Sequence, residues 1–164
     1  MPRDRVGAMV AAMKKPFVAL LLLMIALATV LAGCGAPAVS VGLKIELVRI
    51  VVAADGSALV NWRVVNPNIV PYLLAKGSHR ISLNGVPVGT VNANDALGIP
   101  AQQTAEGTNP LIVEGGAAKQ ALESALAAGS AKYKVESTLT VRIYDEIIDK
   151  SKLLNSGSVP VTAK

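Results

Sequence analysis

The feature that most constrains this chain is an apolar run, Phe17–Val30, that ends just before the only cysteine, Cys34. The run is about 14 residues long, which is short of the roughly 20 residues that a membrane-spanning helix needs. Lys14 and Lys15 stand before it. A positively charged segment followed by a short apolar run is typical of a secretory signal peptide, which is removed from the mature protein. The folded part is therefore expected to begin after residue 33.

The residues at the end of this run resemble the lipobox of bacterial lipoproteins: Leu31, Ala32, Gly33 and Cys34. The resemblance implies that cleavage makes Cys34 the first residue of the mature chain and that it carries acyl chains such as palmitate. Two or more such chains hold a protein stably on a membrane, because each buried methylene contributes about 0.8 kcal/mol. The alternatives are an ordinary signal peptide with a chance cysteine, or a short membrane anchor. A true start at Met13, directly before the two lysines, is an alternative to the start at Met1.

The rest of the chain divides into a tether and one domain. Residues 34–42 are mostly small and are expected to form a flexible tether, and residues 43–164 have the length of a single domain. In lipoproteins, a glycine such as Gly35 after the cysteine, rather than aspartate, implies the outer membrane, facing the periplasm, in a cell with two membranes. In a cell with a single membrane the domain would face outward.

The net charge of +5 overstates the charge of the mature chain. Four basic residues and one acidic residue precede Cys34, which leaves 12 basic and 10 acidic residues after it. These are scattered and form no basic groove studded with aromatic residues, so no nucleic-acid partner is expected. Acylation would consume the only cysteine, so neither a disulfide nor thiolate chemistry is expected.

Alternation of apolar and polar residues predicts a mainly β domain. Val60, Trp62 and Val64 are expected on one face of a strand, and the phase slips near Val48, which predicts a bulge there. The dipeptides Asp55-Gly56 and Asn84-Gly85 tolerate positive φ and predict two-residue hairpin turns. The predicted strands are 43–50, 57–66, 80–83, 86–91, 110–114, 133–143 and 158–161.

One helix interrupts this pattern. Ala117–Ala128 consists of strong helix formers with an apolar stripe on one side, and Gly129 is expected to end it. Residues 93–109 are rich in Asn, Gly, Pro, Gln and Thr and are expected to form a long connection. About seven strands with turns between them and one packed helix predict a two-sheet antiparallel β-sandwich of the immunoglobulin or fibronectin-III kind.

The stretch LVNWRVVNPNIVPYLLAKGSHRISLNG, residues 59–85, resembles the WHy domain (water stress and hypersensitive response), which is shared with the folded group 2 late-embryogenesis-abundant proteins. The match consists of a strand ending in Asn66-Pro67-Asn68 and a later strand running into Asn84-Gly85. The downstream Ile99-Pro100-Ala101, the helix and the strand from Tyr133 also fit. The resemblance implies a two-sheet sandwich with a packed helix and a stress-protective role without catalysis.

The Asn66-Pro67-Asn68 motif has a structural explanation. Proline lacks a backbone donor and drives the preceding residue to extended geometry, so Asn66 is expected to finish a strand. Asn68 is expected to bond the local backbone in an Asx turn. The motif is therefore interpreted as a corner between a strand and a loop rather than as a binding site.

No residue set in the sequence predicts catalysis, a metal or another cofactor. His79 is the only histidine and is expected to take a half-buried packing position or a surface position. Asp145, Glu146 and Asp149 form an acidic cluster that is interpreted as a solvated strand end rather than a weak calcium site. Trp62 is expected to anchor the core, with Asn61 and Arg63 facing solvent.

The function predicted from these observations is that of a membrane-anchored envelope lipoprotein with a non-catalytic domain. It would protect proteins or membrane during desiccation, cold or osmotic stress. Its partners would be membrane lipid through Cys34 and partly unfolded client proteins or an envelope protein. The alternative is a binding module or adaptor in an envelope assembly, with its specificity in the loops 68–78 and 93–109. An enzyme is a third reading, which a deep pocket holding His79 with two carboxylates would favour. The sequence leaves the client, the partner and the oligomeric state open.

Overall fold

The computed structural model describes residues 42–144 and 146–164, apart from the side chains of 148–151. The predicted signal segment, the lipobox with Cys34, and residues 34–41 of the tether lie outside the described residues. Within the described ranges the chain forms eight strands and one helix: β1 (Lys44–Val52), β2 (Ala58–Val65), β3 (Tyr72–Leu83), β4 (Val86–Ala93), β5 (Leu97–Ile99), β6 (Thr104–Val113), α2 (Gly116–Ala128), β7 (Ser130–Ile143) and β8 (Glu146–Ala163).

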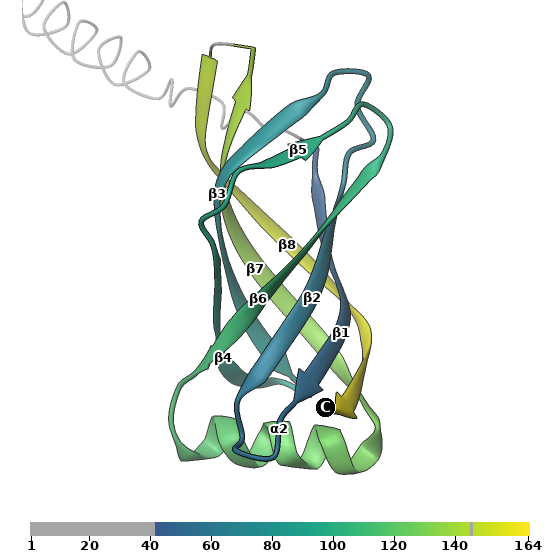
Figure 1. Cartoon of the computed structure of the whole chain (residues 1–164), viewed down its shortest axis with the longest axis vertical. Coiled ribbons are helices and arrows are strands. Elements are labelled where there is room, and N and C mark those ends of the chain that lie inside the picture. The colour runs from purple at the N-terminus through teal and green to yellow at the C-terminus, as the bar shows by residue number, and fades with distance from the viewer. Residues whose placement is uncertain (1–41, 145) are drawn as a thin grey trace, which may run out of the picture. The chain divides into compact units, whose positions relative to one another are not determined.

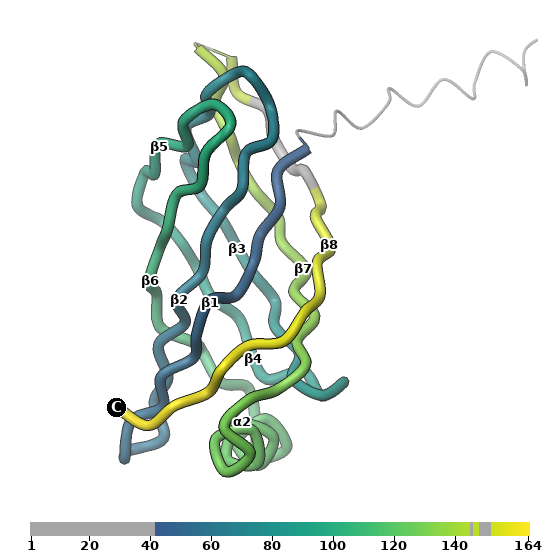
Figure 2. The backbone as a smooth tube through the Cα atoms, turned by 90° about the vertical axis from the view of Figure 1, so that its right-hand side faces the viewer, coloured from purple at the N-terminus to yellow at the C-terminus, as the bar shows by residue number. Residues whose placement is uncertain are grey.

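The strands belong to one hydrogen-bonded sheet. Their order is β4-β6-β2-β1-β8-β7-β3-β5, and β4 also pairs with β3. The additional pairing closes the sheet into a ring of seven strands, and β5 pairs with the start of β3 beside that ring. Neighbouring strands are antiparallel except β1 and β8, which are parallel. Figures 1 and 2 show the strands wrapped around a common interior, with α2 across one end.

The predicted two-sheet sandwich is therefore wrong, because the domain is a closed seven-stranded β-barrel with one helix. Alternation of apolar and polar residues shows that one face of each strand is buried, but it does not show what that face meets. A second sheet and the inside of a small barrel impose the same period of two. A barrel differs from a sandwich in the pairings between strands that are distant in sequence, and no local sequence pattern predicts these pairings.

The structure confirms several local predictions. The pairing of β1 with β2 shifts register between Leu47 and Arg49, at the predicted bulge. Asn84 and Gly85 join β3 to β4 with φ angles of 49° and 86°, as a two-residue turn of this kind requires. The turn at Asp55-Gly56 also joins two paired strands, but its loop is longer than predicted, since the Ala53 N–H donates to the Ser57 carbonyl across it.

The predicted connection 93–109 is wrong in part, because it contains β5 and the first half of β6. The strand pattern is hidden because the side of β6 that faces the barrel carries Ala105, Gly107 and Asn109 rather than large apolar residues. The strand predicted as 80–83 is the 12-residue β3, so the predicted loop 68–78 is wrong from Tyr72 onward. The last strand, predicted as 158–161, is the 18-residue β8. Most of its length is hard to recognise in the sequence because polar residues face outward and because Asn155 and Gly157 stand where a strand would be expected to carry apolar residues.

The composition of β6 is explained by Trp62, which lies opposite Gly107 in the sheet. A side chain at position 107 would clash with the indole ring. The Trp62 Nε1–H donates to Asn109 Oδ1 at 2.9 Å, and the tryptophan is buried. Trp62 therefore anchors the core as predicted, and the strand beside it is made of small and polar residues so that the ring fits.

The helix is confirmed almost to the residue. Ala118, Leu122 and Ala125 are its buried side chains, and they lie on one stripe. Gly129 takes the left-handed conformation at φ 74°, and its N–H donates to the Leu126 carbonyl at 3.1 Å, which ends the helix. Because α2 contacts β4, β7 and β8, it covers one end of the barrel interior (Figure 1).

We expect Gly89→Ala to destabilise the domain by about 3 kcal/mol or more. Gly89 has φ 150° and pairs with Val113 where β4 meets β6, and a Cβ at position 89 would clash with the Ile112 carbonyl. Urea unfolding of the two proteins measures the difference.

The control is Gly98→Ala on β5, where a Cβ meets nothing within 4 Å and φ is not positive. The control is expected to change the free energy of unfolding by less than about 1 kcal/mol. Equal effects of the two substitutions would contradict the proposed tight contact at the closure.

Candidate functional site

Asn66 ends β2 as a buried hydrogen-bonding centre, with only 1% of its surface exposed. Its Nδ2 donates to the Val70 and Pro100 carbonyls, both at 2.9 Å. Its Oδ1 accepts from the backbone N–H of Asn68 at 3.0 Å and from the Asn68 side-chain amide at 3.1 Å. Its own backbone N–H donates to the Gln103 carbonyl. The side chain therefore holds the loop after β2 against the turn before β6.

This geometry confirms that the Asn66-Pro67-Asn68 motif is a strand-to-loop corner, but it corrects the residue that makes the Asx turn. The acceptor is the side chain of Asn66, and Asn68 supplies the donor. Asn68 also lies against Gly42, because its side-chain amide is 3.4 Å from the position that a Cβ of Gly42 would take. The corner therefore also meets the first described residue, where the chain enters the domain.

The second family motif, Asn84-Gly85, has a structural role as well. The Asn84 side-chain oxygen accepts from the Lys132 N–H at 3.0 Å, and the Asn84 N–H donates to the Lys132 carbonyl at 2.8 Å. The hairpin turn is therefore fastened to the start of β7. Neither motif places an unpaired polar group in a cavity of the described domain.

The barrel interior contains an unexpected polar pair. His79 is 1% exposed, and its Nδ1 lies 2.9 Å from the Ser137 hydroxyl, which is also buried. The imidazole tilts against the Trp62 ring, with the ring centroids 4.9 Å apart. Its Nε2 has no hydrogen-bond partner among the described residues. The prediction of a half-buried or surface histidine is therefore wrong, because β3 turns this residue inward.

The pair has the residue types of a nucleophile and its base, but its surroundings argue against that use. A catalytic histidine of this kind is oriented by a third group, commonly a carboxylate, and both partners must meet the substrate. Here no carboxylate bonds the imidazole, and His79 and Ser137 are closed off from solvent. Burial lowers the pKa of His79 from 6.5 to about 4, so the ring is neutral at pH 7. The arrangement fits a core contact.

The buried histidine predicts a pH-dependent stability. The unfolded chain takes up a proton below pH 6.5, whereas the folded domain resists it down to about pH 4. Stability is therefore fully present above pH 6.5 and falls as the pH decreases, by about 2 kcal/mol between pH 7 and pH 5. Urea unfolding at several pH values measures this loss.

His79→Gln, which places a neutral amide at the same position, is the comparison. We expect the variant to lack most of the decrease between pH 7 and pH 5, whatever its stability at pH 7. An unchanged pH dependence in the variant would show that other groups cause the decrease.

The remaining predicted residues are placed as follows. Asp145 lies outside the described residues, as does the side chain of Asp149, so the acidic cluster is not described as a whole. In the described ranges, no three His, Cys, Asp or Glu side chains gather closely enough to hold a metal ion. No helix within those ranges has the length and apolar character needed to cross a bilayer.

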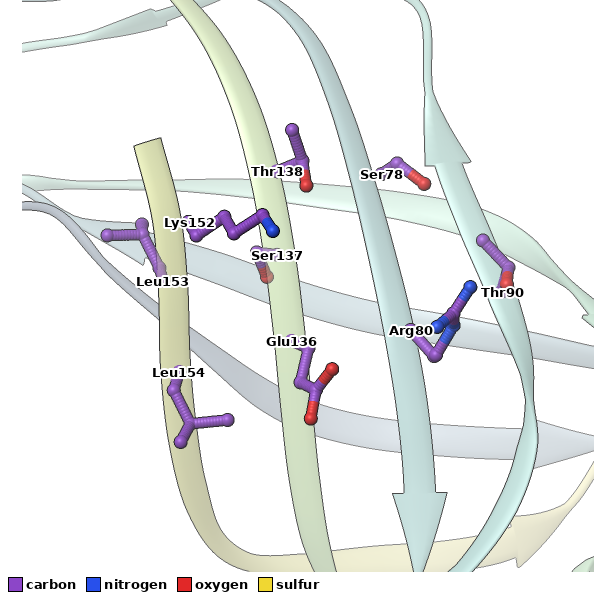
Figure 3. Close-up of a pocket in the computed structure, with 9 residues that line it drawn as sticks. All are labelled: Ser78, Arg80, Thr90, Glu136, Ser137, Thr138, Lys152, Leu153 and Leu154. Carbon is purple, nitrogen blue, oxygen red and sulfur yellow. The ribbon is translucent and has the colours of Figure 1, made fainter. Parts of the chain in front are cut away.

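A groove on the outside of the barrel was not predicted. It has a volume of about 410 Å³ and lies across β4, β3, β7 and β8 (Figure 3). The charged residues that line it are Arg80, Glu136 and Lys152. These residues come from three strands and show no common sequence motif. Only the register of the sheet brings them together, so sequence reasoning had no signal for them.

Comparison with known proteins gives similarities at the level of structure alone. No family model matches the chain, and no curated protein matches its sequence. A protein from Archaeoglobus fulgidus has 18% identity and a TM-score of 0.41, over 72% of this chain and 94% of that one. AT1g01470 from Arabidopsis thaliana has 15% identity and a TM-score of 0.44, over 73% and 78%. The late embryogenesis abundant (LEA) protein At2g46140.1 has 12% identity and a TM-score of 0.43, over 91% and 87%. At these scores the matches assign the chain to no family.

Proposed function

We propose that this chain is an envelope lipoprotein whose mature part is held on a membrane by the acylated Cys34. The observation that carries the anchor is the sequence Leu31-Ala32-Gly33-Cys34 directly behind a short apolar run. In a cell with two membranes, Gly35 after the cysteine favours the outer membrane and a domain in the periplasm. The tether predicted over residues 34–42 would span at most about 30 Å if it were fully extended.

We further propose that the domain is non-catalytic and has a WHy-like, stress-protective role. The support is the pair of sequence motifs, Asn66-Pro67-Asn68 and Asn84-Gly85, at the ends of an early and a later strand. The polar groups of these motifs are used to hold the fold, and the His79–Ser137 pair is sealed in the interior. The domain therefore acts through its surface.

The surface that would shield partly unfolded proteins lies at the end of the barrel where the chain enters. Four exposed apolar side chains belong to the elements of this end: Ile69 (80% exposed), Tyr144 (85%), Ile147 (59%) and Leu73 (37%). The sheet register places Leu73 and Ile147 in one row, because Leu73 pairs with Arg142, which pairs with Ile147, and Ile69 and Tyr144 lie in the adjoining connections. We call these four residues the entry-end patch. Exposed apolar clusters of this kind commonly mark sites of protein contact.

The experiment is a freeze–thaw assay with a labile enzyme and the mature domain. We expect protection above that given by equal masses of albumin and of an unrelated β-barrel. The double variant Ile69→Ser, Tyr144→Ser is expected to lose at least about half of the protection, because it removes the two most exposed apolar groups of the entry-end patch. The loss of enzyme activity after thawing is the measurement.

The control variant is Ile112→Ser, which removes an exposed isoleucine (54%) from β6, outside the entry-end patch. It is expected to protect as the wild type does. No protection above albumin by any form would contradict the shielding role. It would favour the second candidate, an adaptor that uses the same patch for one envelope partner, because Ile69 and Leu73 fall within residues 68–78, where specificity was expected.

A further inference from the structure

Basic residues that are scattered in the sequence come together on the outside of β3, β7 and β8. Six exposed side chains share this face: Lys76, Arg80, Lys132, Lys134, Arg142 and Lys152. Among the described side chains of the same face, Glu136 is the one carboxylate. The mature chain is almost neutral, so this face concentrates its positive charge. No local sequence pattern marks this face, because only the register of the sheet brings these residues together.

The groove of Figure 3 lies within this basic face. Its volume of about 410 Å³ is within the range of small-ligand sites, which is about 300–1,000 Å³. Two rows of side chains cross it through the sheet register. In one row, Arg80 stands opposite Glu136, which stands opposite Leu154. In the neighbouring row, Thr138 stands opposite Lys152. Figure 3 shows Lys152 reaching from β8 across β7 toward Thr138.

The two cations of the groove are not neutralised by ion pairs. Neither Arg80 nor Lys152 lies within 4.0 Å of a carboxylate among the described residues. Glu136 is instead held by Lys134, whose ammonium lies 2.9 Å from its Oε1. The pKa of Glu136 is lowered mainly by this hydrogen bond, and Arg80 and Lys152 lower it further. Lys134 thus neutralises the charge of the Glu136 carboxylate, and the positive charges of Arg80 and Lys152 remain in the groove.

The hydroxyl groups of the groove differ in whether their protons are free to be donated to a ligand. Ser78 donates to Asn92 Oδ1 at 3.1 Å, and Thr90 donates to Glu114 Oε1 at 3.3 Å, so the protons of both hydroxyls are already used. The Thr138 hydroxyl has no such bond in the described structure. The donors left for a ligand are therefore the Arg80 guanidinium, the Lys152 ammonium and the Thr138 hydroxyl.

We propose that this groove binds the phosphate group of a phosphate ester. Arg80 and Lys152 start about two strand spacings apart, roughly 10 Å. Figure 3 shows the Arg80 guanidinium turned toward Thr90, so its long side chain has to rotate for both cations to contact one ligand over Thr138. Once Arg80 has rotated in this way, three donor groups with two positive charges suit the oxygens of a phosphate, which accepts more hydrogen bonds than a carboxylate. Leu154, which is 66% exposed at the end of the row of Arg80 and Glu136, offers apolar contact to the carbon skeleton of the ester.

The phosphate ester has two sources, a soluble molecule or the headgroup of a phospholipid, and the test separates them. The full chain is kept in maltoside micelles, which contain no phosphate, at constant ionic strength. One arm titrates it with glycerol 3-phosphate, and the other with short-chain phosphatidylglycerol. Calorimetry gives the dissociation constant in each arm. Binding in the first arm identifies a soluble ester, and binding in the second alone identifies a lipid headgroup.

The substitutions test the groove itself. We expect Arg80→Gln and Lys152→Gln each to weaken binding at least about five-fold. Lys132→Gln removes a cation of the same face outside the groove and is expected to change binding less than about two-fold. Glu136→Gln removes the negative charge in the groove and is expected to tighten binding about three-fold. All four side chains are exposed, so the variants are expected to fold, which thermal unfolding checks.

Three results would overturn the proposal. The first is the absence of binding in both arms. The second is an equal loss with Lys132→Gln and Arg80→Gln, which would show general attraction to the basic face. The third is weaker binding by Glu136→Gln, which would show that the groove prefers a cation. Because the site does not involve Cys34, its failure leaves the proposed anchor untouched, and failure of the anchor leaves the groove untouched.

Discussion

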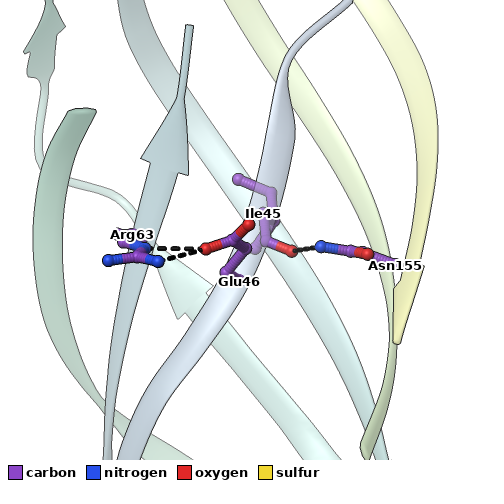
Figure 4. Close-up of polar contacts among 4 residues, drawn as sticks. All are labelled: Ile45, Glu46, Arg63 and Asn155. Carbon is purple, nitrogen blue, oxygen red and sulfur yellow. Dashed lines mark hydrogen bonds and ion pairs between the residues drawn. The ribbon is translucent and has the colours of Figure 1, made fainter. Parts of the chain in front are cut away.

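The closed ring of strands depends on two short seams, at which neighbouring strands share few pairs. Between β4 and β6 only three residue pairs are made, Gly89–Val91 with Leu111–Val113, and between β1 and β8 only three, Ile50–Val52 with Val161–Ala163. Beyond the second seam the two strands are bridged by a side chain, because Asn155 Nδ2 donates to the Ile45 carbonyl at 2.8 Å (Figure 4). This bond satisfies a carbonyl that the backbone ladder does not reach. The nearby Glu46–Arg63 pair, at 2.7 Å, is largely exposed and contributes at most about 1 kcal/mol.

Closure gives a narrow interior, and the interior selects its residues by size. Trp62 fits because Gly107 stands opposite it, and Tyr133 fits because Gly157 stands opposite it. His79 shares this space with Trp62 and lacks a partner for its Nε2. An unpaired polar atom in a core costs stability, so His79 makes the interior less stable than a fully paired side chain would. The two ends of the barrel differ, since α2 covers one and the Asn66 corner organises the other.

The sequence predicted what depends on near neighbours. The hairpin at Asn84-Gly85, the bulge near Val48, the helix and its end at Gly129 all follow from local conformational preferences, and the structure has each of them. The closed barrel was not predictable in this way, because a barrel and a sandwich bury the same face of each strand. β6 was missed because its inward residues are small, and they are small because of Trp62, which lies on another strand. The groove was not predicted either, because its residues come together only through the register of four strands.

The side chains of the two sequence motifs form hydrogen bonds that hold the fold, whereas those of the groove are available to other molecules. The amide of Asn66 and the oxygen of Asn84 are fully engaged in holding loops and strands together. Arg80 and Lys152 take no part in the fold and stand at the surface. The residues that identify a likeness in sequence are thus the structural ones, and the residues available for contact with other molecules lie elsewhere.

The central claim is that this barrel is carried on a membrane by Cys34. Mass spectrometry of the mature protein, recovered from the membrane fraction of its own cells, tests the claim most directly. The account predicts an N-terminal peptide that begins at Cys34 and bears acyl chains, and its loss in a Cys34→Ala variant. A mature chain that begins at another residue, or that begins at Cys34 with an unmodified thiol, would contradict it.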